Sequence, residues 1–380
     1  MSWRVLSSDG LVGNPSKVLR VVDPLQRMEA AGLVERVSLE SLIRRSGTEA
    51  FLDTTALESI DLVFLHVADV SAGTRTLLVP FLERARDQGT AIVCDSDDPY
   101  FVPADGCSFQ AEIAPNLAAI EELCSLAHVV SVTTESLRRE FEGQAERIVV
   151  VPNHLDARFG PSRTRTNERV KIGWCGGPTH TDDLAAVLPA IARLQVRQPV
   201  DFVMFGMFDR NFEASASAVC KIPPKKRAHD AKLAAFGRFA DALRGVHYEH
   251  VPSTSYADFP RRLAELDFDI GLCPLIETRF NRCRSAVKFY QYANAGTLTL
   301  ASDSAAYRGE CSSLVGSTSN AWFEALSRFV GDEDLRAKEL EKQREFVLSQ
   351  RNWEIGVKRY EQLFRTALEA ASETRRVRVR

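Results

Sequence analysis

The sequence lacks the features that would place it in a membrane or in a secretory pathway. It contains no run of about 18 apolar residues, so no transmembrane helix is predicted, and its first residues, MSWRVLSSDG, contain no apolar core of a signal peptide. Its 8 cysteines include no C-x-x-C pair, and its 7 histidines form no cluster with metal-ligand spacing. We therefore expect a cytoplasmic protein with reduced, buried thiols and no metal site.

Neither basic nor acidic residues are in large excess. The chain has 48 basic and 51 acidic residues, for a net charge of −3, so no nucleic-acid partner is predicted. A small basic cluster ends the chain, at Arg375, Arg376, Arg378 and Arg380. A frayed terminus is the preferred interpretation of this cluster, and peripheral contact with an anionic membrane surface is the alternative.

Strands alternate with helices along most of the chain. A length of 380 residues exceeds one compact core and predicts two domains. Apolar runs bounded by turn signals alternate with segments of helical periodicity, which predicts an α/β protein with doubly wound parallel sheets. The predicted strands are 3–7, 61–66, 91–95, 129–133 and 147–152 in the first half, and 170–175, 200–206, 246–251, 268–275 and 298–302 in the second.

A polar stretch without periodicity, 157–169, is predicted to link the two halves. The first domain is accordingly expected at 1–156 and the second at 157–351, and the chain after residue 318 is mostly helical. The stretch 207–244 contains KIPPKKR and is predicted to be a surface insertion with one helix.

The segment 267–302 carries the strongest functional signal. FDIGLCPL is typical of a strand buried on both faces, and AVKFYQYANA is a helix that Ser285 can cap and that ends before Gly296. Asn281, Arg282 and Arg284 precede that helix. A helix that begins at the carboxyl end of a parallel strand, next to arginines, favours an anion site. An ordinary strand–loop–helix unit with solvated basic residues is the alternative.

Two further clusters follow predicted strands. In VKIGWCGGPTHTDDL, Gly176 and Gly177 end a strand, and small residues let a backbone approach a phosphate or sugar closely. In CDSDDPYFVP, Asp95, Asp97 and Asp98 can accept hydrogen bonds from sugar hydroxyls, raise one another's pKa or bind a metal. Turn and cap roles are the alternative for these carboxylates.

Two weaker candidates lie in the first half. Gly10 and Gly13 form a loop between the first strand and a helix, but not a G-x-G-x-x-G fingerprint. His66 closes the strand 61–66, where a satisfied structural histidine is the commoner case, and it remains a secondary catalytic candidate.

The segment 274–296 resembles the donor-binding segment of family-4-type glycosyltransferases with the GT-B fold. The subset concerned is written PL-x(4)-FN-x(2)-[KR]-S-x(2)-K-x(2)-E-Y-x-x-x-G, and it is matched here by Pro274, Leu275, Phe280, Asn281, Arg284, Ser285, Lys288, Tyr292 and Gly296. Other elements of the family are matched by His180 and Asp183 after IGW, by the DSDD cluster, by Arg20, and by Asn153 and His154 in VPNHLD.

The resemblance implies two Rossmann-like domains facing a cleft, with a C-terminal helix at 352–372 crossing back to the first domain. It implies transfer of a sugar from a nucleotide diphosphate sugar to a glycan, a lipid-linked acceptor or a small molecule, with retention and without a metal or other cofactor. Cell-envelope polysaccharide is the default acceptor by analogy. The donor-binding residues would be Gly13, Gly176, Gly177, His180, Asp183, Asn281, Arg284, Ser285, Lys288 and Gln291, and the catalytic residues Asp97, Asp98, His66, Arg284 and Lys288.

The chain departs from the family at the paired glutamates, which become Cys283 and Gln291. In relatives the second glutamate holds two ribose hydroxyls. A glutamine has one acceptor oxygen, so one such bond must reverse or be lost, at about 1 kcal/mol. This departure favours the alternative of a catalytically weak or inactive transferase-like subunit that binds sugars or acts as a scaffold.

Overall fold

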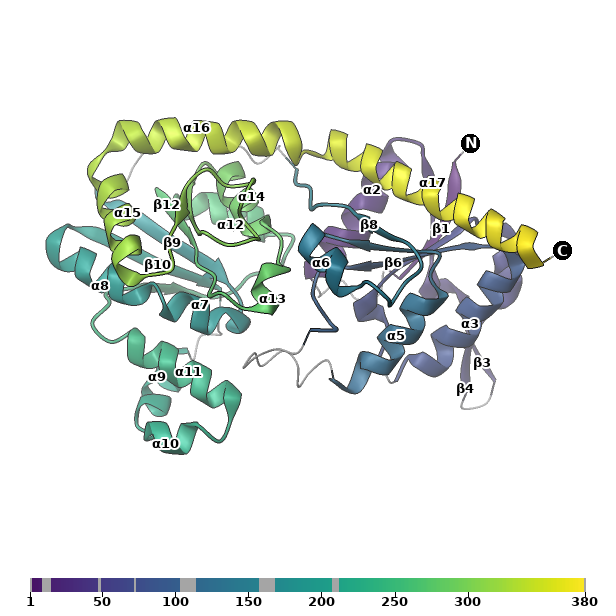
Figure 1. Cartoon of the computed structure of the whole chain (residues 1–380), viewed down its shortest axis with the longest axis horizontal. Helices are drawn as coiled ribbons and strands as arrows, with labels where there is room; N and C mark the ends of the chain where they lie inside the picture. The colour runs from purple at the N-terminus through teal and green to yellow at the C-terminus, as the bar shows by residue number, and fades with distance from the viewer. Residues whose placement is uncertain are drawn as a thin grey trace.

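Two six-stranded parallel sheets form the two lobes of the protein (Figure 1). The computed structural model describes residues 2–8, 15–46, 49–71, 73–102, 114–156, 168–206 and 212–378. The first sheet, in the N-lobe, has the order β2-β1-β5-β6-β7-β8. Its strands are β1 (Trp3–Ser7), β2 (Val34–Ser38), β5 (Leu62–His66), β6 (Ala91–Ser96), β7 (Val129–Val132) and β8 (Ile148–Val150).

The second sheet, in the C-lobe, has the order β11-β10-β9-β12-β13-β14. Strand order reverses between β9 and β12, and ligands of such sheets bind beside the carboxyl ends of the strands at this point. The strands are β9 (Val170–Gly176), β10 (Val200–Gly206), β11 (Glu249–Val251), β12 (Ile270–Cys273), β13 (Leu298–Ser302) and β14 (Leu314–Val315).

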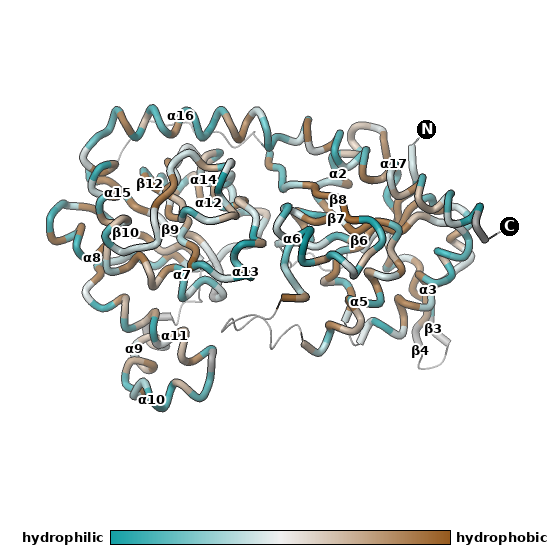
Figure 2. The backbone as a smooth tube through the Cα atoms, viewed as in Figure 1, coloured by the Kyte–Doolittle hydropathy of each residue, from teal (hydrophilic) through white to brown (hydrophobic). Residues whose placement is uncertain are grey.

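Apolar side chains from both faces of each sheet form the cores. Strands β5 and β12 are buried along their whole length, as expected of strands covered by helices on both sides. Figure 2 shows hydrophobic residues concentrated on the strands and hydrophilic ones on outer helices such as α16 (Glu333–Gln350). The predicted doubly wound α/β architecture is therefore present in both halves.

The structure contains short strands that were not predicted. They are β2, β14 and the two strands of a hairpin, β3 (Ile43–Ser46) and β4 (Glu49–Leu52). The hairpin is the only antiparallel pair in the described chain. β14 has two residues, too few to produce a periodic signal, and β2 (VERVS) lies at a sheet edge with mostly polar residues.

Helices connect the N-lobe strands, as the alternating pattern predicts. The helix expected after the loop of Gly10 and Gly13 is interrupted by a π-helical turn, η1 (Val18–Val22). The other helical elements are α1 (Pro15–Lys17), α2 (Asp23–Ala30), η2 (Leu39–Leu42), η3 (Thr54–Ser59), η4 (Val67–Asp69), α3 (Arg75–Gln88), η5 (Ala114–Asn116), α5 (Leu117–Leu126) and α6 (Glu135–Glu140).

The C-lobe helices correct two expectations. The insertion has three helices and not one, namely α9 (Phe212–Cys220), α10 (Pro224–Arg227) and α11 (Ala231–Ala242), and it projects from the C-lobe in Figure 1. The loop expected before Ser285 contains a short helix, α13 (Arg279–Arg282). The remaining elements are η7 (Pro178–His180), α7 (Thr181–Ala185), α8 (Leu188–Arg197), α12 (Phe259–Glu265), α14 (Val287–Asn294) and α15 (Ser319–Gly331).

Helix α17 (Trp353–Arg378) continues from α16 across to the N-lobe, as Figure 1 shows. It packs on α2, β6 and β7, with Tyr360 and Phe364 fully buried. The chain also crosses between the lobes near Leu155, whose N–H donates to Arg351 O at 2.8 Å. The predicted domain boundary at 156/157 adjoins residues outside the described part and stays a prediction.

None of the helices in the described part of the chain is long and apolar enough to cross a bilayer.

Candidate functional site

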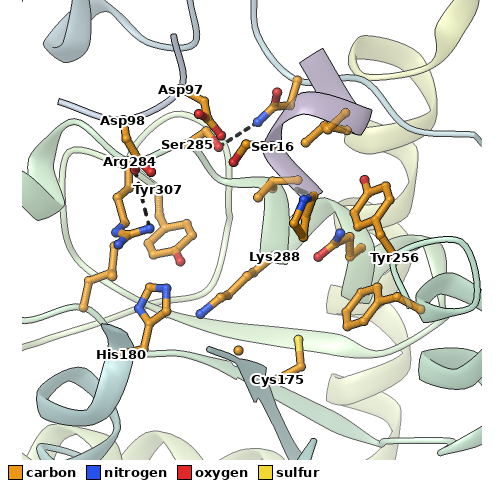
Figure 3. Close-up of a pocket in the computed structure, with 18 of the residues that line it drawn as sticks. Ser16, Asp97, Asp98, Cys175, His180, Tyr256, Arg284, Ser285, Lys288 and Tyr307 are labelled. Carbon is orange, nitrogen blue, oxygen red and sulfur yellow. Dashed lines mark hydrogen bonds and ion pairs between the residues drawn. The ribbon is translucent and has the colours of Figure 1, made fainter. Parts of the chain in front are cut away.

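Most of the predicted site residues line one cavity of about 300 Å³ between the two lobes, which we call the main cavity. Figure 3 shows side chains from both lobes pointing into it. The N-lobe supplies Pro15, Ser16, Leu19, Asp97, Asp98 and Asn153. The C-lobe supplies Cys175, Gly176, His180, Thr254, Tyr256, Phe259, Leu275, Arg284, Ser285, Val287, Lys288, Gln291 and Tyr307.

Two cations of the C-lobe face this cavity with little neutralisation. Arg284 Nη1 lies 3.8 Å from Asp98 Oδ1 across the cavity, and its buried Nε has no hydrogen-bond partner among the described residues. Lys288 forms no ion pair within the described residues, and burial lowers its pKa despite nearby thiols. The two side chains thus leave a positive field that an anion could neutralise.

Helix α14 brings both cations to one place. Arg284 lies in the short segment between α13 and α14, and Lys288 lies in the first turn of α14. The first N–H groups of a helix have no partners within it and carry the positive end of its dipole. The expected capping role of Ser285 is wrong, because Ala286 is the N-cap residue and no side chain caps the helix.

Gly176 makes room for Lys288. A Cβ at this position would lie 2.7 Å from Trp174 Cζ2 and 2.8 Å from Lys288 Nζ. Lys288 Nζ is in turn 5.1 Å from the centroid of the Trp174 ring, a cation–π distance. Any larger residue at 176 would displace the ammonium. Gly177 is not part of the cavity lining, and Gly13 lies outside the described residues.

Behind the lining, Asp183 joins three parts of the C-lobe. It accepts hydrogen bonds from His180 Nδ1 at 2.7 Å, from the N–H of Ile276 at 2.9 Å and from Asn281 Nδ2 at 2.9 Å. Burial would raise the pKa of Asp183, but these donors outweigh it and lower the pKa. Asp183 and Asn281 therefore hold the loop and His180 in place, and of these three only His180 lines the cavity.

His180 is neutral in this environment. Burial, with Lys288 and Arg284 nearby, lowers its pKa to about 3. Since the Asp183 carboxylate can only accept, the single ring proton lies on Nδ1. Nε2 is then left as an acceptor beside the cavity.

Carboxylates of the N-lobe form the opposite wall. Burial and the neighbouring Asp97 charge raise the pKa of Asp98 to about 6. Burial would also raise the pKa of Asp97, but the hydrogen bond from His66 outweighs it and lowers the pKa. Asp98 thus titrates near neutral pH while Asp97 stays ionised.

His66 supports Asp97 from behind. Its Nε2 is 3.2 Å from Asp97 Oδ1, and its Nδ1 accepts the N–H of Ala68 at 3.1 Å. An accepting Nδ1 places the proton on Nε2, directed at Asp97. Burial opposes protonation of His66, but the surrounding carboxylates, Asp97 first, raise its pKa overall. His66 does not line the main cavity, so any contact with a ligand would be made through Asp97.

Of the remaining predicted residues, one lines the cavity and the others are buried in the core of the protein. Asp95 is fully buried and paired with Arg20 at 2.7 Å, so it belongs to the N-lobe core and not to the cavity. Gln291 lines the cavity, as predicted. Cys283 is 1% exposed and packs in an N-lobe hydrophobic cluster. Burial, with Glu140 nearby, raises its pKa to about 12, so it does not replace the charge of a glutamate.

Several lining residues were absent from the sequence prediction, among them Ser16, Thr254 and Tyr256. Thr254 and Tyr256 follow the carboxyl end of β11, where ligands of such sheets bind. This position was the only available signal. Tyr256 and Gln291 also border a second cavity of about 430 Å³, which extends to Asp23 and Asp156.

Comparison with known proteins identifies the fold. No family model and no curated protein matches the sequence. Among solved structures, an alpha-glucosyltransferase in complex with UDP-glucose and DNA containing an abasic site has a TM-score of 0.62 at 12% identity, over 96% of this chain and 99% of that one. The chain has the GT-B fold.

Two other GT-B structures match over nearly the whole chain. HepE from Anabaena in complex with UDP has a TM-score of 0.60 at 12% identity, covering 96% of this chain and 100% of that one. An alpha,alpha-trehalose-phosphate synthase (UDP-forming) from Burkholderia vietnamiensis has a TM-score of 0.59 at 12% identity, covering 98% of each. The predicted GT-B architecture, including the returning C-terminal helix, is therefore confirmed.

Proposed function

We propose that this chain is a glycosyltransferase that moves a sugar from a nucleotide diphosphate sugar to an acceptor hydroxyl. The observation that carries the proposal is the pair of cations, Arg284 and Lys288, with little or no neutralisation at the start of α14, facing a cavity between the lobes. A diphosphate is the ligand whose charge and size suit this place. The GT-B proteins similar to this chain include ones solved with UDP and UDP-glucose.

In the proposed mechanism, the bond from the anomeric carbon to the diphosphate oxygen breaks as a bond to the acceptor oxygen forms, and the acceptor hydroxyl passes its proton to the departing diphosphate. Negative charge builds on the leaving diphosphate, and Arg284 and Lys288 stabilise it without rearrangement. Preorganised groups of this kind contribute on the order of 10²-fold in rate each. Retention of configuration is part of the proposal by resemblance to family-4-type enzymes.

The acceptor would bind on the N-lobe wall. The carboxylates of Asp97 and Asp98 can accept hydrogen bonds from sugar hydroxyls, and His66 keeps Asp97 ionised and oriented. Under this proposal, acceptor and donor bind on opposite walls of one cavity, whose lining comes from both lobes. A glycan, a lipid-linked sugar or a small polyol would satisfy the same groups.

A transferase-like subunit that binds nucleotide sugars without turning them over is the second candidate. Two positions favour it. Gln291 lacks the second acceptor oxygen that a glutamate offers to ribose hydroxyls, and Cys283 is buried against the N-lobe, away from the cavity lining.

Calorimetry with UDP, GDP and ADP tests the donor site. Release of the nucleoside diphosphate from the matching nucleotide sugar, in the presence of an acceptor, tests transfer. We expect one of the three to bind and Arg284→Ala to weaken its binding about 10- to 100-fold, the range of a hydrogen bond to a charged group. Arg282→Ala is the matched control, because Arg282 is exposed and pairs with Glu277 outside the cavity. Binding without turnover would select the second candidate, and failure of all three nucleotides to bind at millimolar concentration would exclude the donor site.

A further inference from the structure

A chain of hydrogen bonds leads from the N-lobe core to Ser285 on the wall of the main cavity. Arg20 donates to Asp95 through Nε at 2.9 Å and through Nη2 at 2.7 Å. Its Nη1 donates to Val151 O at 2.8 Å and to Asn153 Oδ1 at 3.0 Å. Asn153 Nδ2 then donates to Ser285 Oγ at 2.9 Å, the contact drawn in Figure 3.

The direction of every bond in this chain is determined by Arg20. A guanidinium has donors only, and Arg20 is fully buried with its orientation fixed by the two oxygens of Asp95. The Asn153 oxygen must therefore face Arg20, because the opposite amide orientation would set two donors against each other. The Asn153 amino group is consequently the one that faces Ser285.

This direction constrains the hydroxyl of Ser285. An amino group can only donate, so Ser285 Oγ is the acceptor and its own proton points away from Asn153. Within the described residues that proton has no recorded acceptor. Ser285 and Asn153 both line the main cavity, next to Arg284 and Lys288.

We infer that Asn153 is a positioning residue that makes the Ser285 hydroxyl a hydrogen-bond donor toward an anion in the main cavity. Under the proposed function, on which this identification rests, the anion is the diphosphate of the donor. Asn153 belongs to the N-lobe and Ser285 to the C-lobe segment before α14, so the same bond links the anion site to the relative position of the lobes.

Asn153→Asp tests the inference because it keeps the contact and reverses its direction. The aspartate still accepts from Arg20, but an oxygen now faces Ser285, so the hydroxyl must donate to it and turn away from the cavity. With whichever of UDP, GDP or ADP binds the wild type, we expect affinity to fall about tenfold or more, the range of a hydrogen bond to a charged group. Affinity for the corresponding nucleoside, which has no phosphate, should change less than about twofold.

Ser285→Ala distinguishes an effect of Asn153→Asp that acts through Ser285 from a direct effect of its added negative charge. If Asn153 acts through Ser285, Asn153→Asp should weaken diphosphate binding at least about three times less in the Ser285→Ala background than alone. An equal factor in both backgrounds would mean that the new charge acts directly, and would overturn the inference. Unchanged affinity in Asn153→Asp would overturn it as well.

Should Asn153→Asp not fold, Ser285→Ala and Ser285→Thr still decide the matter. Removal of the hydroxyl should weaken diphosphate binding about tenfold, and the threonine, which keeps the hydroxyl, should bind as the wild type does. Wild-type affinity in Ser285→Ala would overturn the inference. If the wild type binds none of the three diphosphates, the proposed function fails first, so the two failures are distinguishable.

Discussion

The two lobes hold their cations differently, as Lys17 and Arg20 of the N-lobe and Arg284 and Lys288 of the C-lobe show. In the N-lobe, Lys17 is 2.8 Å from Asp69 and Arg20 is 2.7 Å from Asp95, with all four side chains almost fully buried. In the C-lobe, Arg284 has one distant carboxylate at 3.8 Å and Lys288 has none within the described residues. Removing one partner of a buried ion pair strongly destabilises the fold, whereas charges left without a partner remain available to a ligand.

This difference in pairing also explains why the sequence alone does not predict the role of each cation. Arg20 matches a family element by sequence, and its side chain is fully buried in a π-helical turn. Burial would lower its pKa, but the Asp95 charge outweighs it and raises the pKa, so Arg20 remains a cation. Its role is in the framework of the N-lobe and in the orientation of Asn153.

The largest expected effect comes from removing a paired cation. Arg20→Met leaves the buried Asp95 carboxylate without its partner, which should lower the free energy of unfolding by about 3–5 kcal/mol. Urea denaturation measures the change. Arg20→Met combined with Asp95→Leu is the control and should recover much of the loss, because no uncompensated charge remains. A single-variant loss below about 1 kcal/mol would contradict the framework role.

Removing Lys288, a cation without an ion-pair partner among the described residues, should affect ligand binding and not stability. The pKa of Lys288 is lowered by burial, so its charged form is less favourable in the folded than in the unfolded state. This penalty is present at neutral pH and is relieved as pH rises through the folded-state pKa. Lys288→Met should therefore leave stability unchanged or slightly higher, while nucleoside diphosphate affinity falls about 10- to 100-fold. Denaturation and calorimetry on the same sample check both, and a large loss of stability would place Lys288 in the framework.

Gln291→Glu introduces the glutamate of the family pattern and tests whether the side chain at this position contacts the ribose. A second acceptor oxygen at this position of the cavity should tighten binding of ribonucleotides about fivefold, close to 1 kcal/mol. The gain should be absent for the 2′-deoxyribonucleotide, measured by calorimetry beside the ribonucleotide. Equal gains for both sugars, or no gain, would show that Gln291 does not contact the ribose.

Asp98→Asn should have the smallest effect, and it depends on pH. The pKa of Asp98 is raised to about 6, so its carboxylate is charged at pH 7.5 and competes with an anion for Arg284. The asparagine variant should bind nucleoside diphosphate about threefold more tightly at pH 7.5. The difference should vanish below about pH 5, where Asp98 is protonated in the wild type. Comparing the two proteins at each pH cancels titration of the ligand, and a difference that persists at low pH would exclude Asp98 as its source.

Much of the fold followed from local patterns. Buried strands such as 91–96 and 298–302 are mostly apolar, and their alternation with helices was sufficient to predict most strands of both sheets. The insertion was harder, because α9 to α11 are short helices on the surface of the C-lobe. Their periodicity is brief, and contacts such as Arg227 with Asp241 at 2.7 Å stabilise them.

The candidate site was predictable where its residues are close in sequence. Arg284, Ser285 and Lys288 share one loop and one helical turn, so a pattern reveals them together. The pairing of Asp183 with Asn281 was not predictable, because the two residues are 98 positions apart and both carry chemistry that suits a ligand. The structure shows that they hydrogen-bond to each other behind the cavity lining.

The sequence by itself determined that parallel sheets form and that polar and charged residues gather at the carboxyl ends of their strands, because periodicity and strand composition are local properties. Only the tertiary structure decided which charges are neutralised. Arg20 meets Asp95 across 75 positions, and Asn153 meets Ser285 across 132 positions. Such pairings depend on how helices and lobes pack, and through them packing determines whether a cation supports the fold or faces a ligand.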